Sequence, residues 1–168
     1  RGTVGRAAWI DFDNKVIFDY RYEGRAVIYL ADLLKGRTET LFELSSDEIS
    51  WRVSPDEKYL LIPQNGQSVL LALDSSEPMF LDTAGGMARP EWTQDSQTIY
   101  FWAGSENRII SYNLAGQSFH PLLVRRDLET FSPLPPVYGM PFSVSPDASR
   151  VVFFWENWIW FVELAAAH

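Results

Sequence analysis

The chain contains no cysteine, and its only histidines are His120 and the terminal His168. These absences exclude disulfide bonds and thiol chemistry, and leave no histidine pair for a zinc site. No apolar run approaches the roughly 18 residues of a membrane-spanning helix, and no signal peptide is visible, so we expect no membrane insertion. The start at Arg1 is typical of a processed or excised piece, and residues 165–168 resemble a cloning remnant before a tag.

Positive charge is also scarce: 22 acidic residues face 14 Lys and Arg, for a net charge of −8. An acidic surface repels phosphate backbones, so we expect no nucleic-acid partner. Aromatic residues are plentiful, with 7 Trp, 7 Tyr and 11 Phe. Flat side chains pack well on pleated sheets, so this composition favours a folded, β-rich domain.

One phrase recurs along the chain: an apolar residue, a tight turn with Asp, then a β-rich apolar run. Residues 53–62 and 144–153 are nearly identical copies, residues 92–101 are a looser one, and residues 10–18 are degenerate. The turn aspartates are Asp13, Asp56, Asp95 and Asp147. Their spacing of roughly 40 to 50 residues is in the range of propeller blades. Helical periodicity is nearly absent.

The repeats predict one all-β domain over residues 1–168, a β-propeller with four four-stranded antiparallel blades. The expected blades are residues 5–46, 47–87, 88–130 and 138–164. In the second blade, strands are expected at residues 49–53, 59–63, 68–73 and 79–82. Uninterrupted apolar runs, such as Leu60-Leu61-Ile62, predict strands buried on both faces.

The fourth repeat lacks a fourth strand, which leaves closure of the ring open. One alternative is that residues 1–4 supply a closing strand to the last blade. Another is that the four blades are part of a larger ring. A third is that two chains form a homodimer and complete one ring together.

The Ser54-Pro55-Asp56 and Ser145-Pro146-Asp147 turns resemble the WD-like Pro-Asp repeat of TolB-type β-propellers. The glycine that usually follows Asp is missing, but a type I turn tolerates the residues present. Pro pre-sets φ and Asp bonds neighbouring amides, so the motif specifies a fold. The resemblance implies a non-catalytic scaffold or interaction module that binds a protein or peptide. It also implies an extracytoplasmic, periplasmic location in a bacterium, with a cytoplasmic one left open.

Catalytic and metal sites find little support in the residues. A hydrolase triad needs a Gly-x-Ser-x-Gly elbow, which is absent, and would have to use His120, better interpreted as a surface-strand residue. An alternative is therefore the propeller portion of a peptidase-like enzyme whose catalytic domain lies outside this chain. Asp11 and Asp13 offer oxygens for Ca²⁺, but a solvated turn is the favoured interpretation. We expect no cofactor.

Binding residues are predicted where the chain departs from the repeat, because propellers usually carry function in such segments. The interval between Asp95 and Asp147 is the longest and holds a Pro-rich insertion. The predicted partner-binding residues are Arg125, Arg126, Pro135, Pro136, Tyr138, Trp102 and Trp158. Pro135-Pro136-Val137-Tyr138 has the Pro-Pro-x-Tyr form that WW domains bind, against the alternative of a rigid loop. Trp155, Trp158 and Trp160 leave open a ligand- or carbohydrate-sensing propeller, although core packing is favoured.

Overall fold

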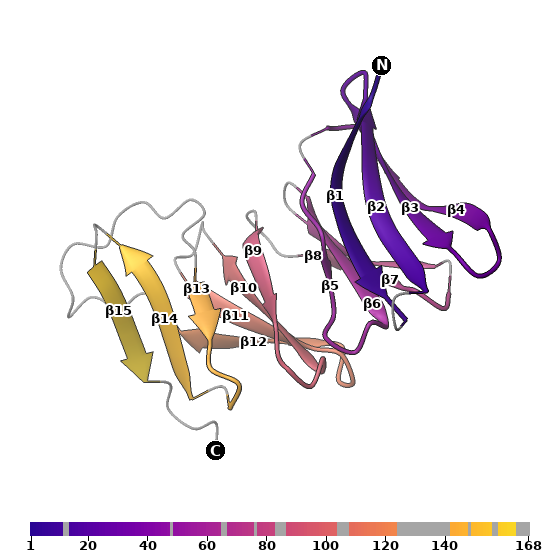
Figure 1. Cartoon of the computed structure of the whole chain (residues 1–168). Coiled ribbons are helices and arrows are strands. Elements are labelled where there is room, and N and C mark those ends of the chain that lie inside the picture. Colours follow the sequence, from indigo (N-terminus) through magenta and orange to yellow (C-terminus); the bar gives the residue numbers. More distant parts are fainter. Residues whose placement is uncertain are drawn as a thin grey trace.

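A computed structural model of the chain (Figure 1) describes residues 1–11, 14–47, 49–64, 67–75, 77–82, 87–103, 108–123, 142–147, 149–155 and 158–163. These residues form fifteen strands and no helix. In this part of the chain there is therefore no helix long and apolar enough to cross a membrane.

The strands form four antiparallel sheets, each ordered as the chain runs. The first sheet contains β1 (Thr3–Ile10), β2 (Lys15–Tyr22), β3 (Arg25–Asp32) and β4 (Arg37–Leu44). The second contains β5 (Arg52–Val53), β6 (Tyr59–Gln64), β7 (Gln67–Ala72) and β8 (Pro78–Asp82). The third contains β9 (Met87–Trp92), β10 (Thr98–Ala103), β11 (Arg108–Asn113) and β12 (Ser118–Leu123). The fourth contains β13 (Phe142–Val144), β14 (Arg150–Trp155) and β15 (Trp158–Glu163). The predicted all-β fold of repeated antiparallel blades is confirmed.

The sheets follow one another along an open arc, with the first and fourth sheets at opposite ends (Figure 1). The outermost labels in this view are β4 and β15, whereas β1, β5, β9 and β13 lie between them. Residues 1–4 do not close the last sheet in this structure. Thr3 and Val4 pair with Arg21 and Tyr20 of β2, so these two residues belong to the first sheet.

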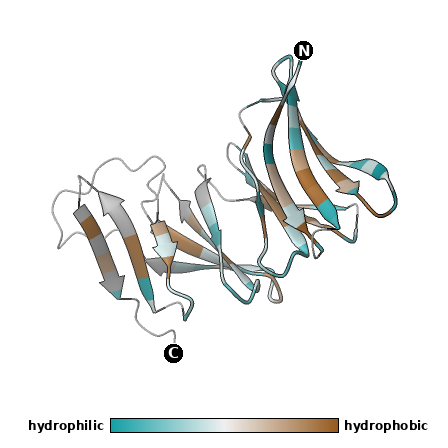
Figure 2. Ribbon diagram, in the orientation of Figure 1, coloured by the Kyte–Doolittle hydropathy of each residue, from teal (hydrophilic) through white to brown (hydrophobic). Residues whose placement is uncertain are grey.

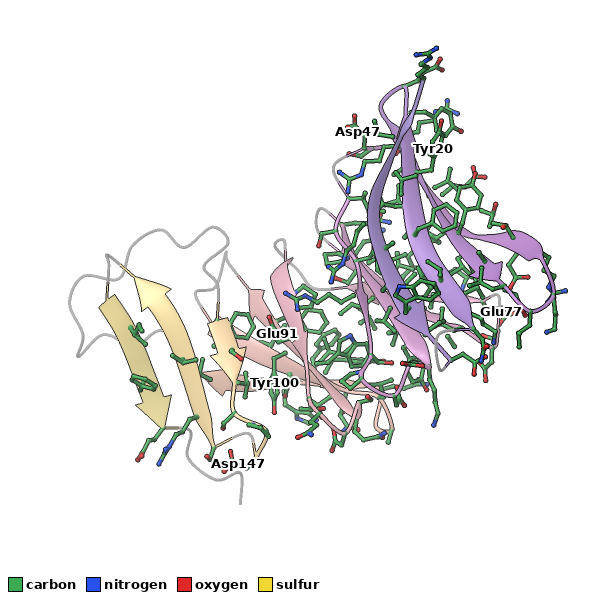
Figure 3. The ribbon with its side chains drawn as sticks, in the orientation of Figure 1. Tyr20, Asp47, Glu77, Glu91, Tyr100 and Asp147 are labelled. Atoms are coloured by element: carbon green, nitrogen blue, oxygen red, sulfur yellow. The ribbon has the colours of Figure 1, made fainter. Side chains whose placement is uncertain are left out.

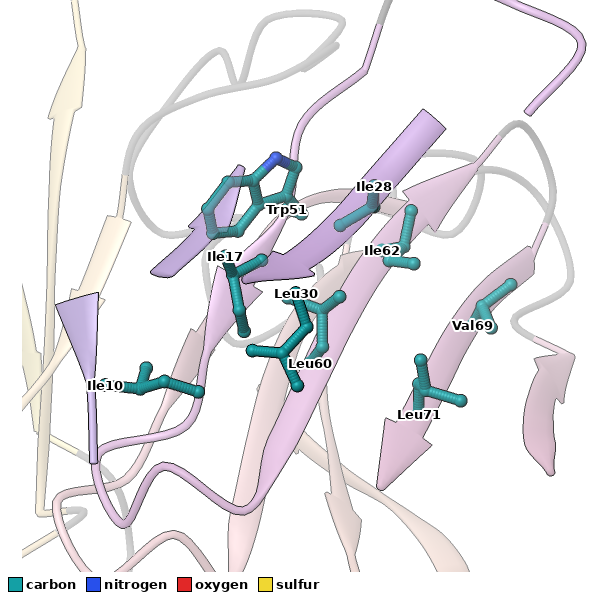
Figure 4. Close-up of a cluster of buried hydrophobic side chains, with 9 residues drawn as sticks. All are labelled: Ile10, Ile17, Ile28, Leu30, Trp51, Leu60, Ile62, Val69 and Leu71. Carbon is teal, nitrogen blue, oxygen red and sulfur yellow. The ribbon is translucent and has the colours of Figure 1, made fainter. Parts of the chain in front are cut away.

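The second sheet is buried on both of its faces. Leu60 and Ile62 of β6 pack against the first sheet, in a cluster that also holds Ile17 and Ile28 (Figure 4). Leu61, between them in sequence, points the other way into a cluster with residues of the third sheet. All three consecutive β6 residues are fully buried. Successive side chains alternate faces, so an apolar run without alternation marks a strand between two sheets.

Two hydrophobic cores therefore join neighbouring sheets. The first consists of Ile10, Ile17, Ile28, Leu30, Trp51, Leu60, Ile62, Val69 and Leu71 (Figure 4). The second consists of Leu61, Leu70, Leu81, Ile99, Phe101, Ile110 and Tyr112. Hydrophobic positions recur along the strands of all four sheets (Figure 2). Burying one large aliphatic or aromatic side chain contributes roughly 1.5–3 kcal/mol, so these contacts hold the sheets face to face.

Candidate functional site

The first strands of neighbouring sheets are joined by polar contacts. Arg6 Nη1, on β1, donates a 2.9 Å hydrogen bond to the carbonyl of Trp51, which immediately precedes β5. Arg52 Nη2, on β5, lies 3.3 Å from Glu91 Oε1 on β9. Strand β9 in turn contacts β13. These four strands form what we call the inner edge of the array, with Glu91 labelled in Figure 3.

A buried carboxylate organises the part of the inner edge between the first and second sheets. Asp19, on β2, is 0% exposed. Its Oδ1 accepts hydrogen bonds from the Arg6 amide at 2.8 Å and from Trp51 Nε1 at 2.8 Å. Its Oδ2 accepts one from Arg21 Nε at 2.7 Å. Both carboxylate oxygens are thus satisfied, as a buried charge requires.

The local sequence leaves room for this arrangement. A register shift interrupts the β1–β2 pairing between Val4 and Ala7, and Gly5 lies in it. A Cβ at residue 5 would collide with the Asp19 carboxylate and lie 2.6 Å from Arg21 Nε. The Arg6 guanidinium then lies 5.1 Å from the centre of the Trp51 ring, which adds a cation–π contact. The bulge therefore opens β1 to admit the carboxylate between two sheets.

Electrostatics favour the ionised form of Asp19. Burial by itself raises its pKa, but hydrogen bonds from Arg21, Trp51 and Arg6 outweigh burial, and the pKa lies below its ordinary value. Glu91 shows the opposite balance: burial raises its pKa, and the nearby Arg52 offsets this only partly. The Asp19 network is therefore a fixed structural element, whereas Glu91 is the more easily protonated carboxylate of the inner edge.

The repeated turns share one hydrogen-bond pattern. Ser54 Oγ donates to Asp56 Oδ1 at 2.6 Å and accepts from the Tyr59 amide at 3.0 Å. Thr93 and Asp95 form the same contact at 2.6 Å. The third copy, with a 2.6 Å bond from Ser145 Oγ to Asp147 Oδ1, lies at the β13–β14 turn, where Figure 3 labels Asp147. Each Asp also accepts from the amide two residues later.

The aspartates of these turns are held ionised by their neighbours. Hydrogen bonds from Ser145 and from Ser149 lower the pKa of Asp147 to about 2. The hydrogen bond from Thr93, followed by that of the Gln97 amide, lowers the pKa of Asp95. For Asp56, burial raises the pKa, but hydrogen bonds from Ser54 and the Lys58 amide bring it below its ordinary value. The carboxylates therefore serve as hydrogen-bond acceptors within each turn.

The position after Asp departs from the expectation for a simple type I turn. Glu57 and Ser96 have φ values of 59° and 60°, in the left-handed region that favours glycine. Their side chains explain why glycine is replaced at these two positions, because each side chain accepts a hydrogen bond from a backbone amide in the turn of the preceding sheet. Glu57 Oε2 accepts from the Asp11 amide at 2.6 Å, and Ser96 Oγ accepts from the Asp56 amide at 2.9 Å. We call these two contacts the turn-to-turn bonds.

Most of the predicted binding residues lie outside the described part of the chain. These are Arg125, Arg126, Pro135, Pro136 and Tyr138, together with the turn residue Asp13. Trp102 lies on β10 and Trp158 on β15, and the structure describes only their backbone. Trp155 and Trp160 are described in the same way. The binding roles and the tryptophan platform therefore stay predictions.

Catalytic and metal chemistry find no assembled site in the described residues. His120 Nε2 lies 2.9 Å from Ser118 Oγ, on the exposed strand β12 at the edge of the third sheet. Among the hydrogen bonds of the described residues, none joins a carboxylate to the His120 ring. Asp11 forms an ion pair with Lys15 at 2.9 Å. No group of three or more His, Asp or Glu in the described ranges is arranged to hold a metal ion.

The inner-edge residues were missed by the sequence reasoning. Asp19 carried a readable signal: it lies two residues after the buried Ile17, and therefore on the same face of β2. A carboxylate at a core position needs partners. Arg6, Arg52 and Glu91 carried no such signal, because their contacts join different repeats.

Comparisons with known proteins find similarity in structure. No family model matches the sequence, and no curated protein sequence does. TolB from Acinetobacter baumannii aligns with a TM-score of 0.59 and 19% identity, over 90% of this chain and 37% of that one. A putative TolB from Agrobacterium tumefaciens gives 0.57 and 18%, over 88% of this chain and 52% of that one.

Peptidase propellers are similar as well. A structure from a study of two prolyl endopeptidases gives a TM-score of 0.62 and 17% identity, over 90% of this chain and 26% of that one. The chain thus spans about half or less of the length of each of these proteins. At such identities the likeness concerns architecture, which many functions share. The four sheets, their antiparallel order and these similarities show that the chain has the fold of a TolB-type β-propeller.

Proposed function

We propose that this chain is part of a non-catalytic, extracytoplasmic propeller that binds a protein or peptide along its inner edge. The observation that carries the proposal is the inner edge itself, where polar side chains from successive sheets meet at one surface. The Arg52 and Glu91 side chains are 40% and 26% exposed, so a partner can reach both of them.

An extended protein segment suits this surface. β1 is the edge strand of the first sheet, and its residues from Thr3 to Ala7 are exposed. An edge strand presents backbone donors and acceptors along one side, which an extended peptide can pair with. The expected partner is therefore an extended segment that carries both polar and charged side chains.

Peptide display tests the binding role. Selection of random dodecapeptides on the immobilised chain, followed by fluorescence anisotropy of the selected peptides, measures affinity directly. We expect Arg52→Glu to weaken binding at least tenfold, because it reverses the charge at the inner edge. Lys35→Glu is the matched control, since Lys35 lies in the β3–β4 turn with a 63% exposed side chain. Equal binding by Arg52→Glu and the wild-type chain would contradict the proposal.

The same peptides test the absence of catalysis. After long incubation with the chain, mass spectrometry should recover every selected peptide intact. Cleavage that depends on the chain would refute the non-catalytic role. Secretion of the parent protein, followed by cell fractionation, tests the extracytoplasmic location.

A second candidate is the propeller portion of a peptidase. The similarity to the prolyl endopeptidase structure, with a TM-score of 0.62, favours it. The tricorn protease also aligns, at 0.58 over 84% of this chain. Under this alternative the catalytic domain adjoins the propeller in the parent protein. Sequencing the gene on both sides of residues 1–168 decides it, because a hydrolase domain would carry a Gly-x-Ser-x-Gly elbow.

A further inference from the structure

One contact between the second and third sheets pairs a tyrosine with a methionine. Tyr112 Oη, on β11, donates a 3.2 Å hydrogen bond to Met79 Sδ, on β8. Tyr112 belongs to the second hydrophobic core and is 3% exposed, whereas Met79 is 38% exposed. Both sheets that form this contact have a further sheet on their other side, the first and the fourth (Figure 1). The sulfur thus lies where a buried hydroxyl meets a surface that small molecules in solution can reach.

The tyrosine ring is held in place by its neighbours. Tyr112 pairs with Ile99 of β10 on one side and with Phe119 of β12 on the other. Its ring centroid lies 4.8 Å from that of Phe119, which is within the range of aromatic packing. Burial raises the pKa of Tyr112, so the hydroxyl keeps its proton at neutral pH and remains a donor. The hydroxyl is therefore a fixed donor directed at the Met79 sulfur.

A thioether is a poor partner for such a hydroxyl. Its sulfur is a weak hydrogen-bond acceptor, and a buried donor without a good acceptor costs free energy. Addition of one oxygen converts the apolar thioether into a polar sulfoxide, whose oxygen is a far stronger acceptor. The methionine side chain has three rotatable bonds, so it can turn that oxygen toward the hydroxyl. Tyr112 is therefore placed to bind the oxidised form of Met79 better than the reduced form.

We propose that Met79 is a site of reversible oxidation by hydrogen peroxide, and that its sulfoxide oxygen takes the Tyr112 hydrogen bond in place of the sulfur. A sulfur lone pair attacks one peroxide oxygen, so an S–O bond forms while the O–O bond breaks. The leaving hydroxide removes the proton from the transferred oxygen and departs as water. The thioether loses the two electrons that the peroxide gains, and methionine sulfoxide reductases reverse the oxidation. Oxidation thus strengthens the contact between the second and third sheets.

Peroxide treatment of the folded chain tests the proposal. The chain has three methionines, so Met87→Leu and Met140→Leu together leave Met79 as the only one. Peptide mass spectrometry should find one added oxygen on Met79, which the two methionine sulfoxide reductases together should remove. The oxidised chain should unfold at a urea concentration about 0.3–0.5 M higher, because one hydrogen bond becomes stronger. A Met79 that stays reduced, or a urea midpoint that does not rise, would overturn the proposal.

Tyr112→Phe separates the hydrogen bond from the other effects of oxidation. The substitution removes only the hydroxyl and keeps an aromatic ring beside Phe119. Without the Tyr112 donor, the sulfoxide places a polar oxygen at the rim of an apolar core, so oxidation should lower the urea midpoint of this variant. An equal rise in Tyr112→Phe and in the parent chain would mean that Tyr112 does not bind the sulfoxide, and the proposal would fail.

Matched controls keep the comparison interpretable. Tyr59 also packs against the second hydrophobic core, where its ring stacks on Trp92, so Tyr59→Phe should retain the rise on oxidation. Met79→Leu in the same background has no methionine, and peroxide should leave its urea midpoint unchanged. Circular dichroism checks that each variant is folded before treatment. Should Tyr112→Phe unfold, the NMR shift of Tyr112 Cζ in the parent chain replaces it, and a shift that does not move on oxidation would contradict the proposal.

Discussion

Substitutions of Ser96 separate the two roles of the residue that follows the turn aspartate. Ser96 is fully buried, has φ 60°, and accepts the turn-to-turn bond from the Asp56 amide. Ser96→Ala removes the hydroxyl but keeps the left-handed strain. Leaving a partly buried donor without its acceptor costs about 1–2 kcal/mol. We therefore expect Ser96→Ala to lower the free energy of unfolding by about 2 kcal/mol.

Ser96→Gly loses the same hydrogen bond but relieves the strain. A left-handed residue with a Cβ costs about 1–2 kcal/mol. Glycine also has more conformational freedom in the unfolded chain, which lowers the free energy of unfolding by about 0.4–1 kcal/mol and so offsets part of this gain. The net difference leaves Ser96→Gly about 1 kcal/mol more stable than Ser96→Ala, with both less stable than the wild-type chain.

Urea unfolding followed by circular dichroism measures these differences. Ser143 is the control, because it is exposed on strand β13, where its φ is not positive. There the order should reverse, with Ser143→Ala more stable than Ser143→Gly, since glycine weakens a strand. The reasoning is refuted if Ser96→Gly is no more stable than Ser96→Ala.

Three further predictions concern other parts of the fold. Gly5→Ala should lower the free energy of unfolding by at least about 2 kcal/mol, because its Cβ displaces the buried Asp19 carboxylate; a melting temperature within a degree of wild type would contradict this. Leu61→Ala should lower the free energy of unfolding, measured in urea, by about 2–5 kcal/mol, because the substitution leaves a cavity; a loss below about 1 kcal/mol would show that β6 is not buried between the first and third sheets. Carboxyl NMR should find the pKa of Asp147 at about 2, so its contribution to stability is complete above about pH 4 and disappears as the pH falls through 2; a midpoint near 3.8 would exclude the Ser145 hydrogen bond.

The positions of strands were largely predictable where a recognisable turn motif marks the end of the strand. The strands expected at residues 59–63 and 68–73 match β6 and β7 to within one residue at each end. The strand expected at residues 49–53 is shorter, since β5 contains only Arg52 and Val53. The carbonyls of Ile49 and Trp51 instead accept hydrogen bonds from arginine side chains of the first sheet. Sequence patterns reveal periodicity. They do not reveal that a side chain from another repeat donates a hydrogen bond to a backbone carbonyl and replaces a strand partner.

The inner edge was much less predictable for the same reason. Asp19 could be recognised as a charge at a core position, but its donors Arg6 and Trp51 come from another strand and another sheet. The pair formed by Arg52 and Glu91 joins two repeats that are both ordinary in sequence. Such contacts depend on how sheets are stacked, which the repeat period does not specify.

The burial of β6 on both faces has a consequence for strand alignment. In most sheets a one-residue slip moves apolar side chains into water, which penalises the wrong alignment. A slip of Leu60-Leu61-Ile62 would only exchange one apolar side chain for another. The alignment must therefore be set by polar groups, and Ser54 and Asp56 bond specific amides at the start of this strand. The Ser-Pro-Asp turn thus acts as the reference point that decides which residue of the strand faces which neighbour.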